Sequence, residues 1–433
     1  MRVLVIGSGA REHTLCWALS RSPRLTKLYC APGNGGTASV AENVSLDPMD
    51  FGACAEWAAR NAIDLTVIGP EDPLSGGIVD VFEQRGLAVF GPTAAAARIE
   101  SSKLWSKSLM ERAGVPTATA ARFTDHSAAA AWVRQRAANA EPFPLVVKAD
   151  GLAAGKGVFI VEDERDALAA LDHLMRERTL GDAGASLLIE EYMRGVELSL
   201  FALTDGERIF PLAPACDYKR ACDQDEGPNT GGMGAYSPPK FATPELLATI
   251  EREILRPTVA ALAADGSPFR GLLYAGLMLT DEGPKVVEFN CRFGDPETQV
   301  VLPRLQSDLL ELCAAVAAGR LDTVPAPVWS DEATCGVVMA SGGYPGTIEV
   351  GKKITGIEEA DQIAGVKVFH AGTSSRDGEY YTSGGRVLGV TARAATLPAA
   401  VSRAYEAAGK IHFDGAHFRK DIAARALKTA SGA

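Results

Sequence analysis

Unbroken apolar runs alternate with helical stretches from residue 1 to about residue 120. The apolar runs end in Gly or Pro and lie at 2–7, 28–32, 65–70 and 88–92. Between them the sequence predicts helices at 10–20, 50–61 and 76–85. Strands that are apolar throughout, rather than at every second position, are typical of a parallel sheet covered on both faces. The pattern predicts a doubly wound α/β domain that binds ligands at the carboxyl ends of its strands.

Three further parts are predicted after this domain (1–120). A helix is predicted at 103–112, just before the second part. Residues 121–193 predict a small α/β unit, with strands at 145–148, 158–161 and 186–190 and a helix at 164–177. Residues 194–328 predict strands at 196–203 and 208–213, a Gly/Pro/Asn-rich loop at 226–239, a helix at 243–264, a hairpin of 272–280 with 285–290, and a helix at 297–319. After a Pro-containing linker at 324–327, residues 329–433 predict a strand-rich domain with late helices.

Composition narrows the class of protein. The chain has 433 residues, 47% hydrophobic and 22% charged, as in globular proteins with sizeable cores. Its net charge of -11 argues against a nucleic-acid or anionic membrane partner but permits a local basic pocket for phosphates. No apolar run reaches the roughly 18 residues that span a bilayer, and the first strand begins at once, without a signal peptide. Eight scattered Cys without a CxxC pair favour free thiols in a reducing compartment, so we expect a soluble cytoplasmic protein.

The first candidate site is the turn after the first strand, Gly7-Ser8-Gly9-Ala10-Arg11-Glu12-His13. It begins like a dinucleotide-binding turn, but Glu12 stands at the third Gly position, and no acid follows the second strand to hold a ribose. These departures disfavour a nicotinamide cofactor. A helix N-terminus beside Arg11 suits one phosphate, and an ordinary tight turn is an equally supported alternative.

The second candidate is the Gly-rich segment from Lys148 to Val158, KADGLAAGKGV. Its spacing differs from a Walker A loop, and it joins two strands instead of opening a helix. Small residues allow the backbone to present N–H groups to phosphate, as lids over nucleotides do. Lys148 ends an apolar strand, where a buried ammonium group requires an anionic partner. We expect a phosphate lid, with a hairpin of solvated lysines as the less favoured alternative.

The third candidate is the strand and turn from Lys285 to Glu297, KVVEFNCRFGDPE. Strand alternation predicts Val286, Glu288 and Asn290 on one face. An acid and an amide supply oxygen ligands to that face, which suits Mg²⁺ bridging ATP phosphates, and Arg292 follows within reach of an anion. A solvated face is the alternative, but Asp-Pro-Glu directly after an apolar strand favours a shaped loop.

The fourth candidate combines Asp217-Tyr218-Lys219-Arg220 with the segment 227–238, GPNTGGMGAYSP. Composition alone predicts a long loop of the kind that often carries function. The six His residues show no metal-binding spacing, and His13, beside the first Gly turn, is the one to test.

These and neighbouring segments together resemble the phosphoribosylamine–glycine ligase family of the ATP-grasp superfamily, from Met1 to about Arg425. The segments are GSGAREH, PGNGGT, GPEDPL, KADGLAAGKGV, EEYMRGVE, GPNTGGMGAYSP, LYAGLML, EFNCRFGDPETQ, SGGYPG and FHAGT. The resemblance implies an α/β ATP-grasp fold, in which 121–193 is a small lid subdomain and 194–328 a large subdomain with a metal site. It also implies that glycine, ATP and 5-phosphoribosylamine react to give glycinamide ribonucleotide, ADP and phosphate in de novo purine (IMP) synthesis. Glycyl phosphate would form first and the sugar amine would attack it, so that no protein nucleophile is required.

The resemblance also implies roles for individual positions. ATP would bind Lys103, Lys148, Gly151, Gly155, Lys156, Gly157, Glu190, Glu191, Met193 and Glu197, with Glu190, Glu191 and Met193 at the adenine and Glu197 at the ribose. Mg²⁺ or Mn²⁺ would bind Glu288 and Asn290. The catalytic residues would be Arg292, Asp217 and Asp295. Substrate would bind Gly9, Arg11, Glu12, His13, Pro70 and Glu71 at its phosphoribosyl end, and Lys219, Gly294 and Pro296. The implied partners are these small molecules, with no nucleic acid or membrane, and the chain would be a monomer.

Two features depart from the family pattern. Members often have Gln and His where this chain has Cys216 and Tyr218, and the superfamily commonly has a metal-binding acid on the strand before Glu288, where 273–279 has none. Phosphates and water would then complete the octahedral metal shell. Two alternatives stay open: another ATP-grasp ligase of purine synthesis, such as the subunit that carboxylates an aminoimidazole ribonucleotide, and a nucleotide-gated binding protein that has lost catalysis. Glycine-dependent ADP production separates them.

Overall fold

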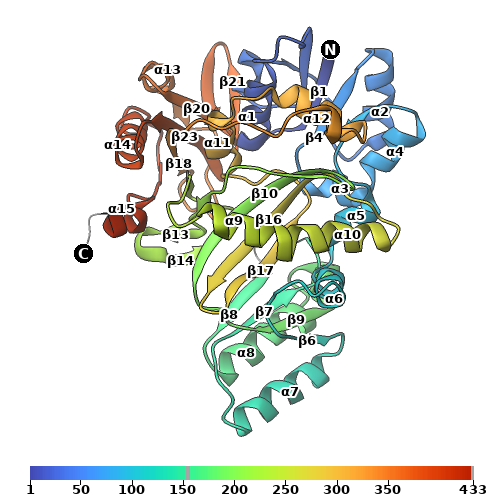
Figure 1. Cartoon of the computed structure of the whole chain (residues 1–433). Helices are drawn as coiled ribbons and strands as arrows, with labels where there is room; N and C mark the ends of the chain where they lie inside the picture. The colour runs from blue at the N-terminus through green and yellow to red at the C-terminus, as the bar shows by residue number, and fades with distance from the viewer. Residues whose placement is uncertain (153–156, 431–433) are drawn as a thin grey trace.

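A computed structural model describes residues 1–152 and 157–430 of the chain. Figure 1 shows the N-terminal and C-terminal parts beside each other at one end of the molecule, and the part with α7 (His126–Ala138) and α8 (Glu164–Leu171) projecting at the other end. A long helical segment crosses the middle of this view, from α9 (Pro244–Ile250) through the π-helical turn η5 (Glu251–Leu255) to α10 (Arg256–Ala264). The mixed α/β architecture confirms the predicted fold class.

The N-terminal part is built on a five-stranded parallel sheet in the order β3-β2-β1-β4-β5. Its strands are β1 (Arg2–Gly7), β2 (Lys27–Pro32), β3 (Glu42–Asn43), β4 (Leu65–Ile68) and β5 (Val89–Phe90). Its helices are α1 (Ala10–Leu19), α2 (Phe51–Arg60), α3 (Glu71–Gly76), α4 (Ile78–Gln84), α5 (Ala94–Ser101) and α6 (Lys103–Arg112). Residues 3–6 of β1 are completely buried, as an apolar run covered on both faces predicts. Because β1 and β4 are parallel neighbours, the segments that follow them lie at the same edge of the sheet.

The projecting part contains a four-stranded sheet in the order β6-β9-β7-β8. The strands are β6 (Ala120–Phe123), β7 (Leu145–Ala149), β8 (Val158–Val161) and β9 (Leu187–Glu191), each antiparallel to its neighbours. Val147 and Ile189 pack into a core with residues of α7 and α8. Since successive side chains of a strand point to opposite faces, Lys148 and Glu190 lie on the face away from that core.

The large central sheet has the order β11-β10-β16-β17. Its strands are β10 (Val196–Asp205), β11 (Ile209–Pro211), β16 (Arg270–Thr280) and β17 (Gly283–Asn290). One face, which includes Leu198, Leu273 and Ala275, forms a core with apolar residues of the helical segment α9–α10. The strand register places Glu197, Ser199, Tyr274 and Glu288 on the opposite face.

The register of β17 corrects one detail of the sequence analysis. Val286 pairs with Leu277 and Glu288 pairs with Gly276, so Val287 is an extra residue at a β-bulge. Adjacent pairs point to opposite faces, and Val286 therefore lies in the core rather than beside Glu288. The prediction that Val286 shares a face with Glu288 is wrong, whereas Glu288 and Asn290 do share one, because the register is regular from Glu288 onward.

The C-terminal part is strand-rich, as predicted, but its main sheet also includes strands from the middle of the chain. The sheet has the order β12-β15-β18-β23-β20, with strands β12 (Cys216–Asp217), β15 (Gly234–Ser237), β18 (Ala333–Ala340), β23 (Arg386–Ala394) and β20 (Val366–His370). Smaller sheets contain β13 (Arg220–Cys222), β14 (Glu226–Asn229), β19 (Lys353–Ile354), β21 (Thr373–Arg376) and β22 (Glu379–Thr382). The helices are α13 (Ile357–Asp361), α14 (Leu397–Ala408) and α15 (Ala424–Ala430).

Two predicted elements are therefore wrong. The loop predicted at 226–239 contains β14 and β15, because β15 pairs with β18 about 100 residues later, a contact that local composition does not reveal. The single helix predicted at 297–319 is divided into α11 (Thr298–Val301), a 3₁₀ turn at Leu302–Arg304 and α12 (Leu309–Ala317). Pro303 lacks a backbone N–H for helix bonds, and the Asp308 carboxylate caps α12 by accepting from Leu310 N at 2.9 Å.

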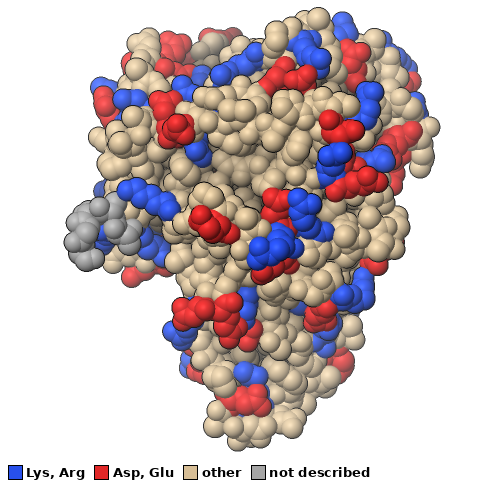
Figure 2. Space-filling view, in the orientation of Figure 1, with Lys and Arg blue, Asp and Glu red and all other residues tan. Residues whose placement is uncertain are grey.

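Two further observations concern the helices and the charges on the surface. Within residues 1–152 and 157–430, no helix is both long enough and apolar enough to cross a bilayer. Figure 2 shows Lys and Arg interspersed with Asp and Glu over the visible face, without a patch of a single sign.

Candidate active site

Three buried charges lie where the small sheet faces the large one. Lys148 Nζ is 2.6 Å from Glu190 Oε2 and donates to the Val287 carbonyl oxygen at 2.9 Å. Lys107 of α6 is 2.6 Å from Glu190 Oε1 and donates to Thr117 and to the Ala118 carbonyl oxygen. Burial alone would raise the pKa of Glu190, but the charges of Lys148 and Lys107 outweigh it and lower that pKa. Glu190 is thus the anionic partner that the sequence required for Lys148.

Lys107 is a member of this cluster that the sequence analysis missed. It is 1% exposed, yet it lies on a helix whose charged residues are typical of a solvated face. Only the packing of α6 against β9 reveals its partner. Since the Glu190 carboxylate is held by two lysines, any contact of this residue with a base would use its backbone.

The Gly-rich segment after β7 is anchored to the N-terminus of α6. The Asp150 carboxylate accepts from Ser102 Oγ and from Leu104 N, each at 3.1 Å. Lys103 Nζ donates to the Gly151 carbonyl oxygen at 3.3 Å, which brings two predicted nucleotide residues together. On the far side of the segment, the Gly157 carbonyl oxygen accepts from Ala149 N at 2.8 Å. Gly155 and Lys156 lie outside the described residues, and the phosphate lid stays a prediction.

The predicted adenine and ribose residues follow β9. Glu191 Oε1 accepts from Thr119 N at 3.0 Å and lies 4.0 Å from Lys285 Nζ. Met193 is half-buried in the connection to β10. Glu197 is exposed and is the first residue of β10 on the face that carries the site. Its Oε2 is 3.4 Å from Lys219 Nζ.

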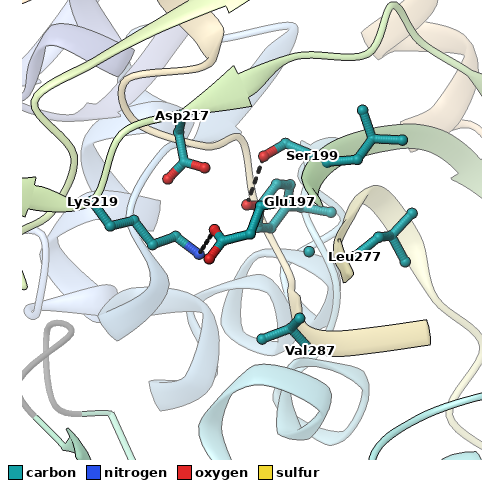
Figure 3. A pocket seen from close by; sticks show the side chains of 9 residues that line it. Glu197, Ser199, Asp217, Lys219, Leu277 and Val287 are labelled. Atoms are coloured by element: carbon teal, nitrogen blue, oxygen red, sulfur yellow. Dashed lines mark hydrogen bonds and ion pairs between the residues drawn. The ribbon is translucent and has the colours of Figure 1, made fainter. Parts of the chain in front are cut away.

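A small hollow lies on the site face of the large sheet. Figure 3 shows residues of β10, β12, β16 and β17 around it, together with Lys219 from the segment that follows β12. Its walls are Glu197, Leu198, Ser199, Asp217, Lys219, Tyr274, Gly276, Leu277 and Val287. Burial raises the pKa of Asp217 to about 7; Lys219 opposes the shift, and Glu297 and Glu197 add to it. The neighbouring Glu197 raises the pKa of Lys219 well above its usual value.

A buried carboxylate stands behind this hollow. Glu297, which is 4% exposed, accepts at Oε1 from Ser199 Oγ and from Tyr274 Oη, each at 3.1 Å. The two hydroxyl oxygens are 3.0 Å apart. A Cβ atom at Gly294 would lie 2.5 Å from Glu297 Oε2, so the glycine leaves room for this carboxylate. No local sequence signal marks Glu297, Ser199 or Tyr274 as members of this site.

Glu288 and Asn290 lie beside the hollow on the same face. Burial opposes ionisation of Glu288, but Lys219, Lys103, Lys148 and Arg292 together lower its pKa. Asn290 Nδ2 donates to Glu100 Oε1 at 2.9 Å, an arrangement that leaves its Oδ1 as a possible ligand. No group of three or more His, Cys, Asp or Glu in the described parts of the chain could hold a metal ion by itself. Two oxygen donors fit a hard divalent cation only when phosphates and water supply the other ligands.

Glu100 is a further buried residue for which the sequence predicted no role. Its carboxylate binds Asn290, the backbone N–H of Cys291 at 2.7 Å and the Arg292 guanidinium at 2.9 Å. It therefore fixes the end of β17, although it belongs to α5 in the N-terminal part. A single Glu in an Ala-rich helix carries no sequence signal for this role.

Arg292 and Arg11 share partners at the junction of the N-terminal part and β17. Arg292 Nε is 3.1 Å from Glu71 Oε2, and Arg11 is 3.6 Å from the same oxygen. Both guanidinium groups also donate to the Phe293 carbonyl oxygen. Burial would raise the pKa of Glu71, but the two arginines lower it to about 2. Glu71 begins α3 directly after Pro70, so the predicted substrate residues Arg11, Pro70 and Glu71 do meet.

Glu12 explains why the first turn departs from a dinucleotide site. Its Oε2 accepts from Gly9 N at 2.6 Å, and its Oε1 from Arg11 Nε at 2.6 Å. A Cβ atom at Gly7 would lie 2.5 Å from Glu12 Cγ, and one at Gly69 2.1 Å from Oε1. The side chain thus occupies the space above the turn that a bound pyrophosphate would need.

His13 faces the C-terminal part of the chain. Its Nδ1 accepts from His370 N at 2.9 Å, so its proton is on Nε2, which is buried without a hydrogen-bond partner among the described residues. Burial, together with His370 and Lys367, lowers the pKa of His13 well below its usual value. Asn34 joins the same two regions, because its Nδ2 donates to the carbonyl oxygens of Ser8 and His370, each at 2.8 Å.

The turn after β17 is held by side chains from two other regions. Asp295 accepts from Gln299 Nε2 at 2.6 Å and lies 3.4 Å from the Arg386 guanidinium. Burial opposes its ionisation, but Arg386 and Arg11 lower its pKa. Pro296 packs on Gly232, where a Cβ atom would lie 2.3 Å from the proline ring.

Cys216 and Tyr218, the two residues that depart from the family pattern, do not line the hollow. Cys216 donates its Sγ–H to the Glu197 carbonyl oxygen at 3.3 Å. The Tyr218 ring is buried and stacks on the Arg419 guanidinium, 4.8 Å from the ring centre. Alternation along the chain leaves Asp217 and Lys219 at the hollow, so the two departures affect the packing of this segment rather than the walls of the site.

Comparisons with known proteins agree over nearly the whole chain. Family models match in order: the phosphoribosylglycinamide synthetase N domain at residues 1–100, its ATP-grasp (A) domain at 101–298 and its C domain at 334–425. The chain is 48% identical to a phosphoribosylamine–glycine ligase of Brucella melitensis, covering 99% of each protein. It is 47% identical to one of Pseudomonas aeruginosa, covering 100% of each.

Solved structures give the same result for the fold. The phosphoribosylamine–glycine ligase of Thermotoga maritima superposes with a TM-score of 0.82 at 32% identity, covering 98% of this chain and 100% of that one. The biotin carboxylase domain of a Hydrogenobacter thermophilus 2-oxoglutarate carboxylase, solved with MgADP, superposes with a TM-score of 0.71 at 18% identity, covering 96% and 91%. The latter likeness concerns the ATP-grasp fold alone.

Proposed function

The chain belongs to the phosphoribosylamine–glycine ligase family, and we propose that it joins glycine to 5-phosphoribosylamine with ATP, giving glycinamide ribonucleotide, ADP and phosphate in de novo purine synthesis. The observation that carries this proposal is the group of cations around Glu288. Lys103, Lys148, Lys219 and Arg292 come from separate elements, and the charge of each lowers the pKa of this one carboxyl group. Such a concentration of cations beside an acid suits a triphosphate with a divalent ion.

The reaction needs charge neutralisation rather than a protein nucleophile. A carboxylate oxygen of glycine attacks the γ-phosphorus of ATP, the bond to the β-phosphate oxygen breaks, and ADP leaves. The amine of phosphoribosylamine then attacks the acyl carbon of glycyl phosphate; phosphate leaves and the nitrogen loses a proton. The lysines hold the phosphates, and Arg292 stabilises charge on the acyl phosphate.

We assign the divalent ion to Glu288 and Asn290. When bound, Mg²⁺ or Mn²⁺ would neutralise phosphate charge at this position. The chain's own contribution is to keep both oxygen donors on one face, through the regular end of β17 and the Glu100 bond to Asn290.

The other parts of the substrates are assigned to different parts of the chain. We place adenine at Glu190, Glu191 and Met193, the ribose at Glu197, and the phosphates under the segment that includes Gly151, Gly155, Lys156 and Gly157. The N-terminal part (1–120) would receive the phosphoribosyl end at Gly9, Arg11, Glu12, His13, Pro70 and Glu71. Asp217, Lys219, Gly294, Asp295 and Pro296 would surround glycine and the reacting amine.

We further propose that the reaction takes place in the cytoplasm. In support, all eight Cys are free, and seven of them are buried, as expected in a reducing compartment. That the chain acts as a monomer, without a nucleic-acid or membrane partner, stays a prediction.

An omission assay tests this function. Purified protein with ATP, Mg²⁺, glycine and 5-phosphoribosylamine should release ADP and form an amide, and leaving out either glycine or the ribosylamine should abolish product formation. ADP release that is independent of glycine but requires bicarbonate and an aminoimidazole ribonucleotide would contradict the proposal in favour of the carboxylating alternative.

A further inference from the structure

Two motifs of the sequence, PGNGGT at 32–37 and FHAGT at 369–373, have no part in the function proposed above, yet they meet in the structure. A Cβ atom at Gly36 would lie 2.4 Å from His370 Cδ2 and 2.6 Å from His13 Cε1. A glycine at this position lets the backbone approach both rings. The first motif therefore lies directly between α1 of the N-terminal part and β20 of the C-terminal part.

The side chain of Asn34 is the centre of this junction. It is 9% exposed, and all its partners are backbone groups. The carbonyl oxygens of Ser8 and His370 accept from Nδ2, each at 2.8 Å, that of Gly9 lies at 3.3 Å, and Oδ1 accepts from Gly36 N at 2.9 Å and Thr37 N at 3.0 Å. An amide has two N–H donors and two acceptor lone pairs, so these partners use the full capacity of Asn34. The side chain therefore acts on the protein backbone rather than on a substrate.

The turn after β1 needs such bonds because its own residues do not fix it. Ser8 stands between Gly7, whose φ is +129°, and Gly9, and residues without side chains allow several orientations of the adjoining peptide planes. The C=O and N–H groups of a trans peptide unit point in opposite directions. Holding the Ser8 and Gly9 carbonyl oxygens toward Asn34 therefore directs the N–H groups of Gly9 and Ala10 to the opposite side of the turn, at the N-terminal end of α1.

A second amide side chain, that of Asn43, holds the same loop but not the turn. Asn43 Nδ2 donates to the Asn34 carbonyl oxygen at 2.9 Å, and its Oδ1 accepts from Thr37 Oγ1 at 2.7 Å. Asn43 is an exposed residue of β3. Both of its partners belong to the motif at 32–37. Asn43 thus provides a matched control for Asn34, because it has the same side chain and supports the same loop.

We infer that Asn34 is a positioning residue for 5-phosphoribosylamine. It fixes the peptide planes of the turn 7–9 against β20, and so keeps the N-terminal end of α1 in the orientation that receives the phosphoribosyl group. The C-terminal part contributes through the His370 carbonyl oxygen, which orients the Asn34 amide without touching the substrate. This inference rests on the proposed function, since that function places the phosphoribosyl end at Gly9 and Arg11.

Asn34→Asp tests this role at almost constant shape. The variant keeps the oxygen that accepts from Gly36 and Thr37, but a carboxylate oxygen replaces the donating nitrogen and faces two carbonyl oxygens. Losing two hydrogen bonds and leaving their acceptors unpaired should raise the KM for 5-phosphoribosylamine about 10-fold or more. The KM values for ATP and glycine should change less than about twofold, because neither is proposed to bind at this turn. Asn43→Asp makes the same chemical change and should leave all three KM values within about twofold.

The comparison of KM values separates positioning from a loss of stability. A variant that is only less stable contains less folded enzyme, so its apparent kcat falls while its KM values stay the same. Circular dichroism during heating gives the melting temperature of each variant and shows that it is folded in the assay. Equal rises in all three KM values, an unchanged KM for the ribosylamine in folded Asn34→Asp, or the same rise in Asn43→Asp would overturn the inference.

Asn34→Ser keeps the experiment decisive if Asn34→Asp does not fold. A hydroxyl group has one hydrogen to donate and cannot bond to both Ser8 and His370, so the same selective rise is expected, and a wild-type KM for the ribosylamine would again overturn the inference. If the wild-type protein forms no product from the ribosylamine, the proposed function fails, and this role fails with it. If the wild-type protein forms product and the Asn34 variants keep its KM for the ribosylamine, only the role of Asn34 is refuted.

Discussion

Replacing Glu190 by glutamine should destabilise the protein more than removing either of its lysine partners. The carboxylate is 3% exposed and binds Lys148 and Lys107, each at 2.6 Å. Glu190→Gln leaves two ammonium groups buried beside each other without an anion. Two unit charges about 4 Å apart interact by about 4 kcal/mol at an effective dielectric of about 20, and breaking a buried ion pair costs about 3 to 5 kcal/mol.

Lys107→Met gives the matched comparison. It leaves the Glu190–Lys148 pair, whose net charge is zero, so its cost should be the smaller loss of a hydrogen bond to a charged group, about 1.5 to 3 kcal/mol. Glu191→Gln, in the next and half-buried position, should cost under about 1 kcal/mol. Urea denaturation at pH 7, followed by circular dichroism, gives the free energy of unfolding of each variant.

The contribution of Glu190 to the free energy of unfolding should decrease at acidic pH. The pKa of Glu190 is lower in the folded protein than in the unfolded chain, so its contribution to stability is full above the unfolded value of about 4.3 and is lost as pH falls through the folded value. The difference in stability between wild type and Glu190→Gln should therefore shrink on acidification below about pH 4. A Glu190 variant as stable as Lys107→Met at pH 7 would refute the reasoning.

Four other changes have specific outcomes. Glu288→Ala should abolish turnover without lowering the melting temperature by more than a few degrees, and a near-normal kcat would contradict its assignment to the metal site. Arg11→Ala should raise the KM for 5-phosphoribosylamine far more than that for ATP, whereas equal rises in steady-state assays would count against a role at the phosphoribosyl end. The kcat/KM for glycine should increase with pH through about 7, because the pKa of Asp217 is raised to that value and, under the proposed function, its ionised form would lie beside glycine; Asp217→Asn should lose this limb of the pH profile, and a variant that keeps it would show that another group titrates. Arg419→Ala should lower the free energy of unfolding by about 3 to 5 kcal/mol, since this fully buried guanidinium binds Asp225 and Asp421, and urea denaturation that gives under about 1 kcal/mol would contradict that value.

The N-terminal sheet could be predicted because its strands are marked locally. An apolar run such as 3–6 is buried on both faces whichever strands lie beside it, and the Gly or Pro residues that follow it mark where the run ends. The segment 234–237 has no such mark. Its Gly, Ala, Tyr and Ser residues form a strand because β18 is available as a partner, and that contact depends on the tertiary structure.

The site was predictable to the extent that its residues lie close together in the sequence. Glu288 and Asn290 lie in one strand and Arg292 follows it directly, so alternation places them without any knowledge of the rest of the fold. Lys107 and Glu100 lie on helices of ordinary composition, and their partners at 190 and 290–292 are far away in the chain. Glu297 lies in a quoted motif, but its hydrogen bonds to Ser199 of β10 and Tyr274 of β16 depend on tertiary contacts that the local sequence does not show.

The fate of a carboxylate oxygen tests the central claim most directly. If glycine is activated as glycyl phosphate, one oxygen of its carboxylate leaves with the phosphate when the amine attacks. Glycine labelled with ¹⁸O in both carboxylate positions should therefore give inorganic phosphate that contains one ¹⁸O atom, detected by mass spectrometry, and an amide that retains the other. Phosphate without label, formed at the same rate as labelled glycinamide ribonucleotide, would show that the carboxylate is never phosphorylated.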